Sequence, residues 1–382
     1  MTTFLSAGLV AAQQPQSQQP GHQVNPDGSI TFRYDAPAAA KVELKLDLFA
    51  APLPLQRSPD GEWQLTTPPL PPNIYAYSFL VDSEPRLDPT NADVRPNYVY
   101  LDNNVTVPGH PPMPWELNDI PHGRVDTHIY TTKVANNLPA NQSAYLVYTP
   151  PGSDAHRKSG YPVLYLLHGW SDRETGWVSV GKANLILDSL IDSGKAVPMI
   201  VVMPLGYGDL DFVTHGFSAW DDAARVDANV ALFSKTLLTE VLPAVERDYN
   251  VASDRSHRAI AGLSMGGLES LTIGLNHPRQ FSYVGAFSAA LFHERFAAHF
   301  PGLATHDDTK NPGLNLLWVA CGSADSLIQQ NNSFTAWART EGLNVTSVET
   351  SGAHTWLTWR ENLLRFAPLL FHNEGAAAKA ID

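Results

Sequence analysis

The sequence predicts an α/β protein in which a mostly parallel sheet is flanked by helices and preceded by a small immunoglobulin-like β-sandwich. Residues 21–120 hold short stretches that alternate apolar and polar side chains, whereas strand-like and helix-like stretches alternate from about residue 121 onward. The second pattern is typical of a parallel sheet with helices on both faces. A length of 382 residues accommodates both units.

The predicted sandwich is built from short strands separated by Pro, Gly, Asp and Asn. Its strand-like stretches are "SITFRYDAP", "KVELKLDLF", "EWQLTTPPL", "IYAYSFLVD" and "NYVYLDNNVTV". Trp63, Tyr75 and Tyr77 have the chemistry to stack on sugars, but the alternation around the tyrosines favours core packing for most of them.

The start of the chain has two interpretations. Residues 1–20 combine a short apolar region without a basic leader and a Gln/Pro-rich run, so they are either the remnant of a secretory signal or a disordered tail. At the other end of the sandwich, "PGHPPMPWELNDIPHG" (108–123) predicts a linker, because proline disrupts both helices and central strands. We therefore expect a boundary near residue 121, with the core of the second domain wholly beyond it.

The second domain, residues 121–382, alternates two kinds of stretch. The strand-like ones are "AYLVYTPP", "YPVLYLLHG", "AVPMIVVMP", "HRAIAGL", "YVGAFSAA", "NLLWVACG" and "VTSVETSGAH". Helical periodicity marks "KANLILDSLIDSG", "ALFSKTLLTEVLPAVERDY", "SFTAWARTEG" and "TWRENLLRFAPLLF".

Composition excludes several classes of partner. A formal charge of −13 without a basic run argues against nucleic acid, and the longest apolar stretch is too short to span a bilayer. The single cysteine, Cys321, has no partner for an intrachain disulfide and lies in an apolar run, so we expect it to fill core space. No H-E-x-x-H or other metal-ligand spacing is present, and we expect no metal and no cofactor.

The segment "HRAIAGLSMGGLES" (257–270) carries the chemistry. Gly262-Leu263-Ser264-Met265-Gly266 matches G-x-S-x-G between a predicted strand and a predicted helix, which is the nucleophile elbow of α/β-hydrolases. A serine hydroxyl needs a histidine to remove its proton and an acid to orient that histidine. Ser264 is therefore the predicted nucleophile.

The order Ser, acid, His directs the search for the partners downstream. Asp325 follows the strand "LLWVACG", and His354 ends "VTSVETSGAH", so both are expected at the carboxyl edge of the sheet. The rival acids Asp307 and Asp308 lie in a polar stretch without a preceding strand and read as a solvated loop. We predict Asp325 as the acid and His354 as the base.

Two further groups are expected around the serine. The tetrahedral intermediate needs N–H donors, for which we predict the amides of Met265, next to the nucleophile, and Trp170, in "YLLHGW" after a buried strand. The insert "GYGDLDFVTHGFSAWDD" is rich in aromatic residues at a strand end, which suits flat aromatic rings and sugars. The predicted substrate-binding residues are Tyr207, Phe217, Trp220 and Trp356.

"YLLHGWSDRETGW", "VVMPLGYG", "DRSHRAIAGLSMGG", "ACGSADSLI" and "SGAHTWLTWRENL" resemble the esterase D-type feruloyl esterases over about residues 124–372. "RLDPTNADVRP" and "DIPHG" resemble the carbohydrate-binding-module-48-like (E-set) domain that precedes such esterases. The resemblance implies the triad Ser264, Asp325 and His354, a secreted or periplasmic protein, and release of ferulate or related hydroxycinnamates from plant cell-wall polysaccharides such as arabinoxylan.

Four alternatives stay open at this point. A carbohydrate acetyl esterase and a mycolyl-type acyltransferase would use the same triad. A siderophore-trilactone esterase would gather Arg and Lys for its anionic substrate, whereas the candidate loops hold mainly Asp and aromatic residues. A glycan-binding protein without catalysis would have no need of all three triad residues.

Overall fold

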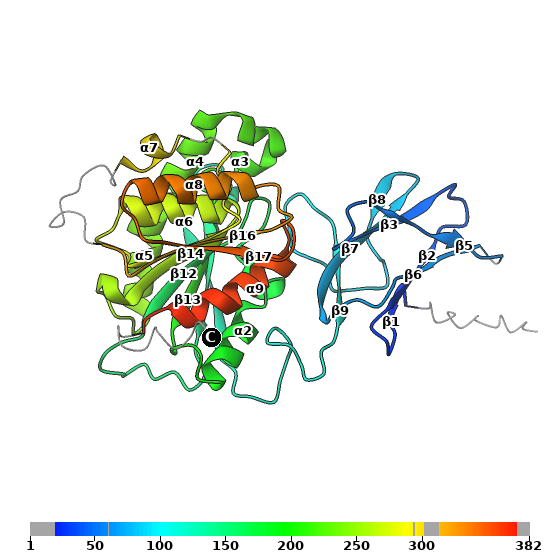
Figure 1. The fold of residues 1–382 in the computed structure, drawn as a ribbon, viewed down its shortest axis with the longest axis horizontal. Coiled ribbons are helices and arrows are strands. Elements are labelled where there is room, and N and C mark those ends of the chain that lie inside the picture. The colour runs from blue at the N-terminus through cyan, green and yellow to red at the C-terminus, as the bar shows by residue number, and fades with distance from the viewer. Residues whose placement is uncertain (1–19, 60, 293–294, 302–312, 373–382) are drawn as a thin grey trace, which may run out of the picture.

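The computed structural model describes residues 20–59, 61–292, 295–301 and 313–372. Figure 1 shows a small all-β unit beside a larger unit in which helices cover a central sheet. The predicted N-terminal tail, apart from Pro20, lies outside the described residues, as do the rival acids Asp307 and Asp308.

The N-terminal unit consists of two antiparallel sheets. One has the order β1-β2-β6-β5, and the other has the order β4-β3-β7-β8 with β9 paired to β7. The strands are β1 (His22–Val24), β2 (Ile30–Asp35), β3 (Val42–Leu46), β4 (Leu53–Pro54), β5 (Gln56–Arg57), β6 (Glu62–Thr66), β7 (Asn73–Val81), β8 (Glu84–Arg86) and β9 (Asn103–Val107).

A cluster of apolar side chains fills the space between these sheets. Its largest members are Phe32, Trp63, Tyr75, Tyr77 and Phe79, all buried. Since none of the three aromatics considered for sugar stacking is exposed, core packing is their role, as the alternation indicated. The Tyr77 hydroxyl donates to a buried carboxylate nearby, which satisfies its one polar group inside the core.

The larger unit contains an eight-stranded sheet with the order β10-β11-β13-β12-β14-β15-β16-β17. Strands β10 and β11 run antiparallel to their neighbours, and the rest are parallel. Their bounds are β10 (Arg124–Thr131), β11 (Gln142–Thr149), β12 (Val163–Leu167), β13 (Ile200–Pro204), β14 (Arg258–Leu263), β15 (Tyr283–Phe287), β16 (Leu316–Gly322) and β17 (Val345–Thr350). The predicted boundary near residue 121 falls between β9 and β10.

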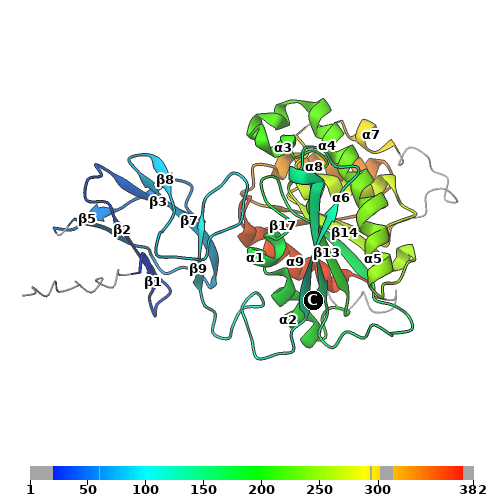
Figure 2. The ribbon, with the colours of Figure 1, turned by 180° about the vertical axis from the view of Figure 1, so that it is seen from behind.

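Helices cover both faces of this sheet, because the side chains of its strands alternate between two buried clusters. One face carries α1 (Gly176–Ser179), α2 (Ala183–Asp192) and α9 (Trp356–Phe366), and the other carries α4 (Ala223–Thr236), α5 (Leu242–Asp248), α6 (Met265–Asn276) and α8 (Ile328–Thr340). Figures 1 and 2 show the two layers from opposite sides. The short helices α3 (Asp211–Thr214) and α7 (Phe296–His299) lie in loops.

The two units share a core, so the expectation that the second core lies wholly beyond residue 121 is wrong. Ile74 of β7 and Trp115 of the linker belong to the same buried cluster as Trp177 and Leu363. Leu357 of α9 packs in turn against the core of the sandwich. The sequence could not show this, because apolar residues in a strand pattern do not reveal which of two cores they enter.

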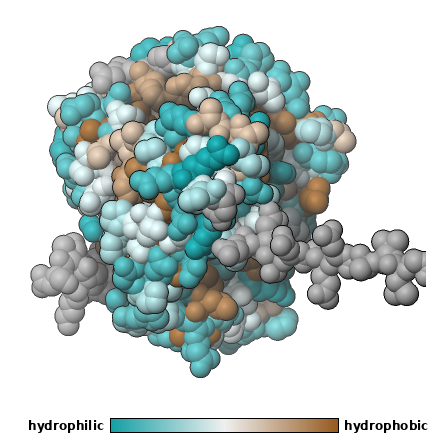
Figure 3. Space-filling model, turned by 90° about the vertical axis from the view of Figure 1, so that its right-hand side faces the viewer, coloured by the Kyte–Doolittle hydropathy of each residue, from teal (hydrophilic) through white to brown (hydrophobic). Residues whose placement is uncertain are grey.

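The surface and the remaining sequence predictions are in keeping with a globular protein. Figure 3 shows that the face on the side of the N-terminal unit is largely hydrophilic with scattered apolar residues. No helix among the described residues is long and apolar enough to cross a membrane. Cys321 is buried, which confirms its predicted place in the core, and this burial raises the pKa of its thiol to about 12.

Candidate active site

Ser264 occupies a sharp turn between β14 and α6. Its backbone has φ 52° and ψ −112°, a conformation that costs a non-glycine residue free energy. The flanking glycines make the turn sterically feasible: a Cβ on Gly262 would lie 2.4 Å from the Gly266 carbonyl oxygen, and one on Gly266 would lie 2.5 Å from the carbonyl oxygen of His168. The G-x-S-x-G spacing is therefore a packing requirement of this turn.

The three residues predicted as a triad come together at the carboxyl edge of the sheet. The Ser264 hydroxyl donates to Nε2 of His354 at 3.0 Å, and Nδ1 of His354 donates to the two carboxylate oxygens of Asp325 at 2.9 and 3.1 Å. The tautomer follows from the carboxylate, which accepts only. The Asp325 side chain is fully buried, whereas a third of the His354 side chain is exposed.

The surroundings keep Asp325 ionised. Burial raises the pKa of this carboxyl, but hydrogen bonds from His354, the Leu327 amide and the Ser288 hydroxyl outweigh it and hold the pKa below its ordinary value. Trp359 lies edge-on to His354, with ring centroids 4.9 Å apart, and its indole N–H donates to Ser288 at 3.2 Å. The acid and the imidazole are thus held by one connected set of side chains.

Sequence reasoning missed Ser288. This serine directly follows β15, is fully buried and has φ 51°, so it repeats the backbone strain of Ser264 one strand away. Nothing in "AFSAA" distinguishes it from a serine that packs in the core.

The two predicted oxyanion donors come from segments that lie next to the serine. The Met265 amide begins α6 directly after Ser264, and the Trp170 amide follows β12. A Cβ on Gly169 would lie 3.4 Å from the Ser264 Cβ, which shows how closely this loop approaches the elbow. Within the described part of the chain neither amide has a hydrogen-bond partner, so both are free to donate to a substrate oxygen.

His168 fixes the path of the loop that carries Trp170. Its Nε2 accepts from the Gly206 amide at 2.8 Å, which leaves the proton on Nδ1 to donate to the Gly169 carbonyl oxygen at 2.8 Å. Burial lowers the pKa of this histidine, which keeps it neutral. In the sequence, "YLLHGW" predicted only the place of the Trp170 amide and not this role of His168.

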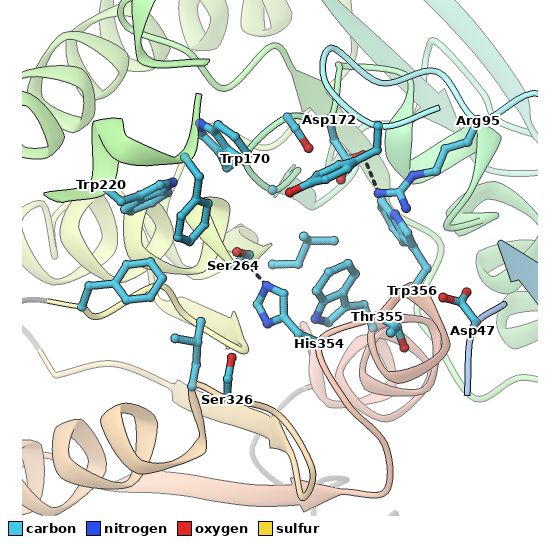
Figure 4. Close-up of a pocket in the computed structure, with 18 residues that line it drawn as sticks. Asp47, Arg95, Trp170, Asp172, Trp220, Ser264, Ser326, His354, Thr355 and Trp356 are labelled. Atoms are coloured by element: carbon cyan, nitrogen blue, oxygen red, sulfur yellow. Dashed lines mark hydrogen bonds and ion pairs between the residues drawn. The ribbon is translucent and has the colours of Figure 1, made fainter. Parts of the chain in front are cut away.

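A cavity of about 360 Å³ opens above the serine (Figure 4). Aromatic side chains form much of its wall: Tyr100, Trp170, Phe217, Trp220, Phe292, Trp356 and Trp359. Of these, Phe217 is the most exposed at 59%. The cavity therefore presents flat apolar surfaces within reach of the nucleophile.

Three of the four predicted substrate-binding residues, Phe217, Trp220 and Trp356, line the cavity. The prediction for the fourth, Tyr207, is wrong, because this residue does not line the cavity. It is 1% exposed, and its hydroxyl donates to the Asp172 carbonyl oxygen at 3.1 Å. A tyrosine directly after a strand has the same sequence pattern whether it faces a cavity or supports a turn.

The N-terminal unit contributes to the cavity as well. Asp47, Arg95 and Tyr100 line it, although they precede the linker. Arg95 pairs with Asp172 at 3.0 Å, as Figure 4 shows, so its charge is matched within the wall. The sequence contained no signal for this, since a lone arginine in a polar loop is ordinary.

Residues 140–370 match the model of the Esterase family. A relative from Xylanibacter ruminicola, named endo-1,4-beta-xylanase/feruloyl esterase, is 30% identical over 363 residues; the match covers 92% of this chain and 46% of the relative. The chain thus spans about half the length of that relative.

Solved structures show the same fold. One described as a ferulic acid esterase has a TM-score of 0.51 and 26% identity, covering 65% of this chain and 97% of its own. The enterobactin esterase of Shigella flexneri has a TM-score of 0.64 at 18% identity, covering 90% of this chain and 94% of its own. The latter similarity extends over both units and concerns the fold alone.

Proposed function

The chain belongs to the Esterase family, and we propose that it is a carboxylic-ester hydrolase with an α/β-hydrolase fold that uses Ser264 to release ferulate or related hydroxycinnamates from feruloylated plant polysaccharides. The observation that carries the proposal is the hydrogen-bonded series Ser264, His354 and Asp325 beneath an aromatic cavity. The name of the Xylanibacter relative supports the same substrate class.

In the proposed reaction, the Ser264 oxygen bonds to the ester carbonyl carbon while its proton passes to Nε2 of His354. The amides of Met265 and Trp170 donate to the oxyanion that forms. The imidazolium then protonates the departing alkoxide as the ester C–O bond breaks, which leaves an acyl-enzyme. Water, deprotonated by His354, repeats the sequence and releases the acid. Asp325 holds the imidazole in the required tautomer.

The cavity wall supports an aromatic acyl group. A hydroxycinnamoyl ring has two apolar faces, and the side chains of Phe217, Trp220 and Trp356 offer edges and faces against which it can be buried. An acetyl group would leave most of that surface unused. The sugar that carries the acyl group would extend outward past the exposed rim.

Two features of this proposal concern the protein's setting. The N-terminal sandwich is proposed to be a carbohydrate-binding-module-48-like domain, and the protein is proposed to be secreted or periplasmic, where plant polysaccharide is accessible. The two antiparallel sheets of that unit support the first feature, and the name of the Xylanibacter relative, which joins a xylanase to a feruloyl esterase, supports the second.

A siderophore-trilactone substrate is less well supported. The charged side chains that line the cavity are Asp47, Arg95 and Asp172, and the single cation among them is already paired. Such a wall offers little attraction to a strongly anionic ferric complex. A carbohydrate acetyl esterase remains the leading alternative, because the same triad serves it.

The test is a comparison of kcat/KM for methyl ferulate and methyl acetate with the full chain. We expect methyl ferulate to be preferred by at least about tenfold, which corresponds to about 1.4 kcal/mol of transition-state binding. A preference for methyl acetate would contradict the assignment of the acyl group and favour the acetyl esterase.

A further inference from the structure

Residues 95–98 of the N-terminal unit form hydrogen bonds to Ser171 and Asp172, in the turn that follows β12. Arg95 Nη2 and Asn97 Nδ2 donate to the same oxygen of Asp172, at 3.0 and 2.9 Å. Asn97 Nδ2 also donates to the Ser171 hydroxyl at 3.1 Å, and the Tyr98 amide donates to the Ser171 carbonyl oxygen at 2.8 Å. Four hydrogen bonds thus join segments more than 70 residues apart.

This turn after β12 is buried, and its backbone is strained. Ser171 has φ 72°, and the side chains of Ser171 and Asp172 are almost completely buried. In the described structure, the side-chain partners of the Asp172 carboxylate both come from residues 95–97. Burial disfavours the charge of Arg95, but the Asp172 carboxylate outweighs it and raises the pKa of the guanidinium. Removing these partners would leave a buried carboxylate poorly satisfied.

The same turn presents the Trp170 amide, the residue immediately before Ser171. Gly169, one residue earlier, lies against Ser264, so a small displacement of the turn moves the amide relative to the nucleophile. A misplacement of about 1 Å is enough to cost a large factor in rate. Tyr100 adds a further contact, with its ring edge-on to the Trp170 indole at 6.5 Å.

We infer that Asn97 and Arg95 are positioning residues of the reaction. Through them the N-terminal unit holds the turn after β12 so that the Trp170 amide can donate to the oxyanion. This inference rests on the proposed roles of Ser264 and the Trp170 amide. It makes the N-terminal unit part of the catalytic centre for every ester, including those too small to touch it. A role in binding polysaccharide alone would not affect such esters.

Asn97 permits a sharp test because it holds the turn without lining the cavity. Its Oδ1 accepts from the amides of Val99 and Tyr100 at 2.9 and 2.8 Å. The variant Asn97→Asp keeps this acceptor, and with it the local loop, but turns a second carboxylate oxygen toward Asp172. The variant therefore loses the Nδ2 donor to Ser171 and Asp172, and the two carboxylates of residues 97 and 172 repel each other.

The probe is p-nitrophenyl acetate with the full-length protein. We expect Asn97→Asp to lower kcat by about tenfold to a hundredfold and to leave KM within about threefold, because acylation and deacylation both pass through an oxyanion. In the double variant Asn97→Asp/Asp172→Asn the two carboxylates no longer repel each other, and it should regain at least about threefold of the lost kcat.

Leu101→Ala is the matched control, because Leu101 lies in the same loop, is 58% exposed and does not line the cavity. It should keep the wild-type kcat. Thermal unfolding of each variant shows whether it is folded at the assay temperature, and Asn97→Ala, which removes the donor without repulsion, replaces Asn97→Asp if that variant is not.

An unchanged kcat in the folded Asn97 variants, a loss confined to KM, or an equal loss in Leu101→Ala would overturn the inference while leaving the proposed function intact. Failure of the wild-type protein to hydrolyse any ester would instead refute the proposed function.

Discussion

Ser264 and Ser288 directly follow adjacent parallel strands and have nearly the same unusual backbone, φ 52° and φ 51°. One hydroxyl donates to His354, and the other helps to lower the pKa of Asp325. Strain of this kind persists only where the surrounding contacts enforce it. In both cases the enforced geometry aims a hydroxyl at a member of the same hydrogen-bonded series.

Phe217 allows the acyl preference to be tested at one residue. Its ring is 59% exposed, lines the cavity and lies edge-on to Trp170 at 5.6 Å. We expect Phe217→Ala to lower kcat/KM for methyl ferulate by about tenfold, since an aromatic contact is lost, and to change that for methyl acetate by less than about threefold.

The control for this substitution is Ile129→Ala. Ile129 is similarly exposed, at 71%, but lies on β10 and does not line the cavity. Steady-state kinetics on both esters measure the effect. Equal losses on the two esters in Phe217→Ala would show that the ring does not contact the acyl group.

At the scale of elements, strand order explains why site residues distant in sequence meet. Ser264, Asp325 and His354 follow β14, β16 and β17, whose carboxyl ends share one edge of the sheet. The elbow spacing and the order of the three residues could therefore be predicted from the sequence. The supporting contacts of Tyr207, Ser288 and His168 could not be predicted. They depend on the paths of loops, which no local sequence pattern describes.

The linker contacts helix α2 through a titratable side chain, that of His122. Asp188 of α2, whose side chain is 1% exposed, accepts from the Tyr148 hydroxyl and the Gly123 amide, and it also faces Nδ1 of His122 at 2.9 Å. The other ring nitrogen of His122 faces the Asn118 carbonyl oxygen at 2.9 Å. Only the protonated imidazole can donate to both.

This contact predicts a pH-dependent stability. The hydrogen bond to Asp188, followed by that to Asn118, raises the pKa of His122 above its ordinary value of 6.5. A raised pKa in the folded state stabilises the protein below the unfolded pKa and loses that effect as pH rises through the folded pKa. We expect His122→Gln to lower Tm more at pH 5.5 than at pH 9; a Tm difference independent of pH would refute the contact's role.

At the scale of the whole molecule, the two units behave as one folded body. Arg360 of α9 is completely buried and donates to the Asn73 side chain at 2.8 Å and to the carbonyl oxygens of Ile74 and Val180 at 2.6 and 3.0 Å. Burial lowers its pKa to about 10, so it remains charged at neutral pH. In the sequence, Arg360 looks like any charged residue of a surface helix, and only a contact with a partner 287 residues away reveals its place.

Loss of this arginine should destabilise the whole chain. We expect Arg360→Ala to lower the free energy of unfolding by about 3–5 kcal/mol, since it leaves several buried acceptors unpaired. Arg365→Ala is the control on the same helix: that side chain is 50% exposed and pairs with Glu361, so its loss should cost less than about 1 kcal/mol. Urea unfolding measures both, and equal effects would contradict a shared core.

The same contacts change what is expected of the isolated hydrolase unit. A chain without residues 1–120 would lose Ile74 and Trp115 from the common core, and Arg360 would lose its partners on Asn73 and Ile74. We therefore expect that this shortened chain does not fold as a stable enzyme, in contrast to the separate core that the proline-rich linker indicated.

The proposed role of Ser264 is tested most directly by methyl ferulate hydrolysis with wild-type protein and Ser264→Ala, each shown to be folded by circular dichroism. Because the hydroxyl is proposed to form the acyl-enzyme, we predict that the wild-type protein releases ferulate and that kcat of the variant is lower by at least about 10⁴-fold. The Tm of the variant should stay within a few degrees of the wild-type value. A variant that keeps more than about a tenth of the wild-type rate would place the nucleophile elsewhere and contradict the account.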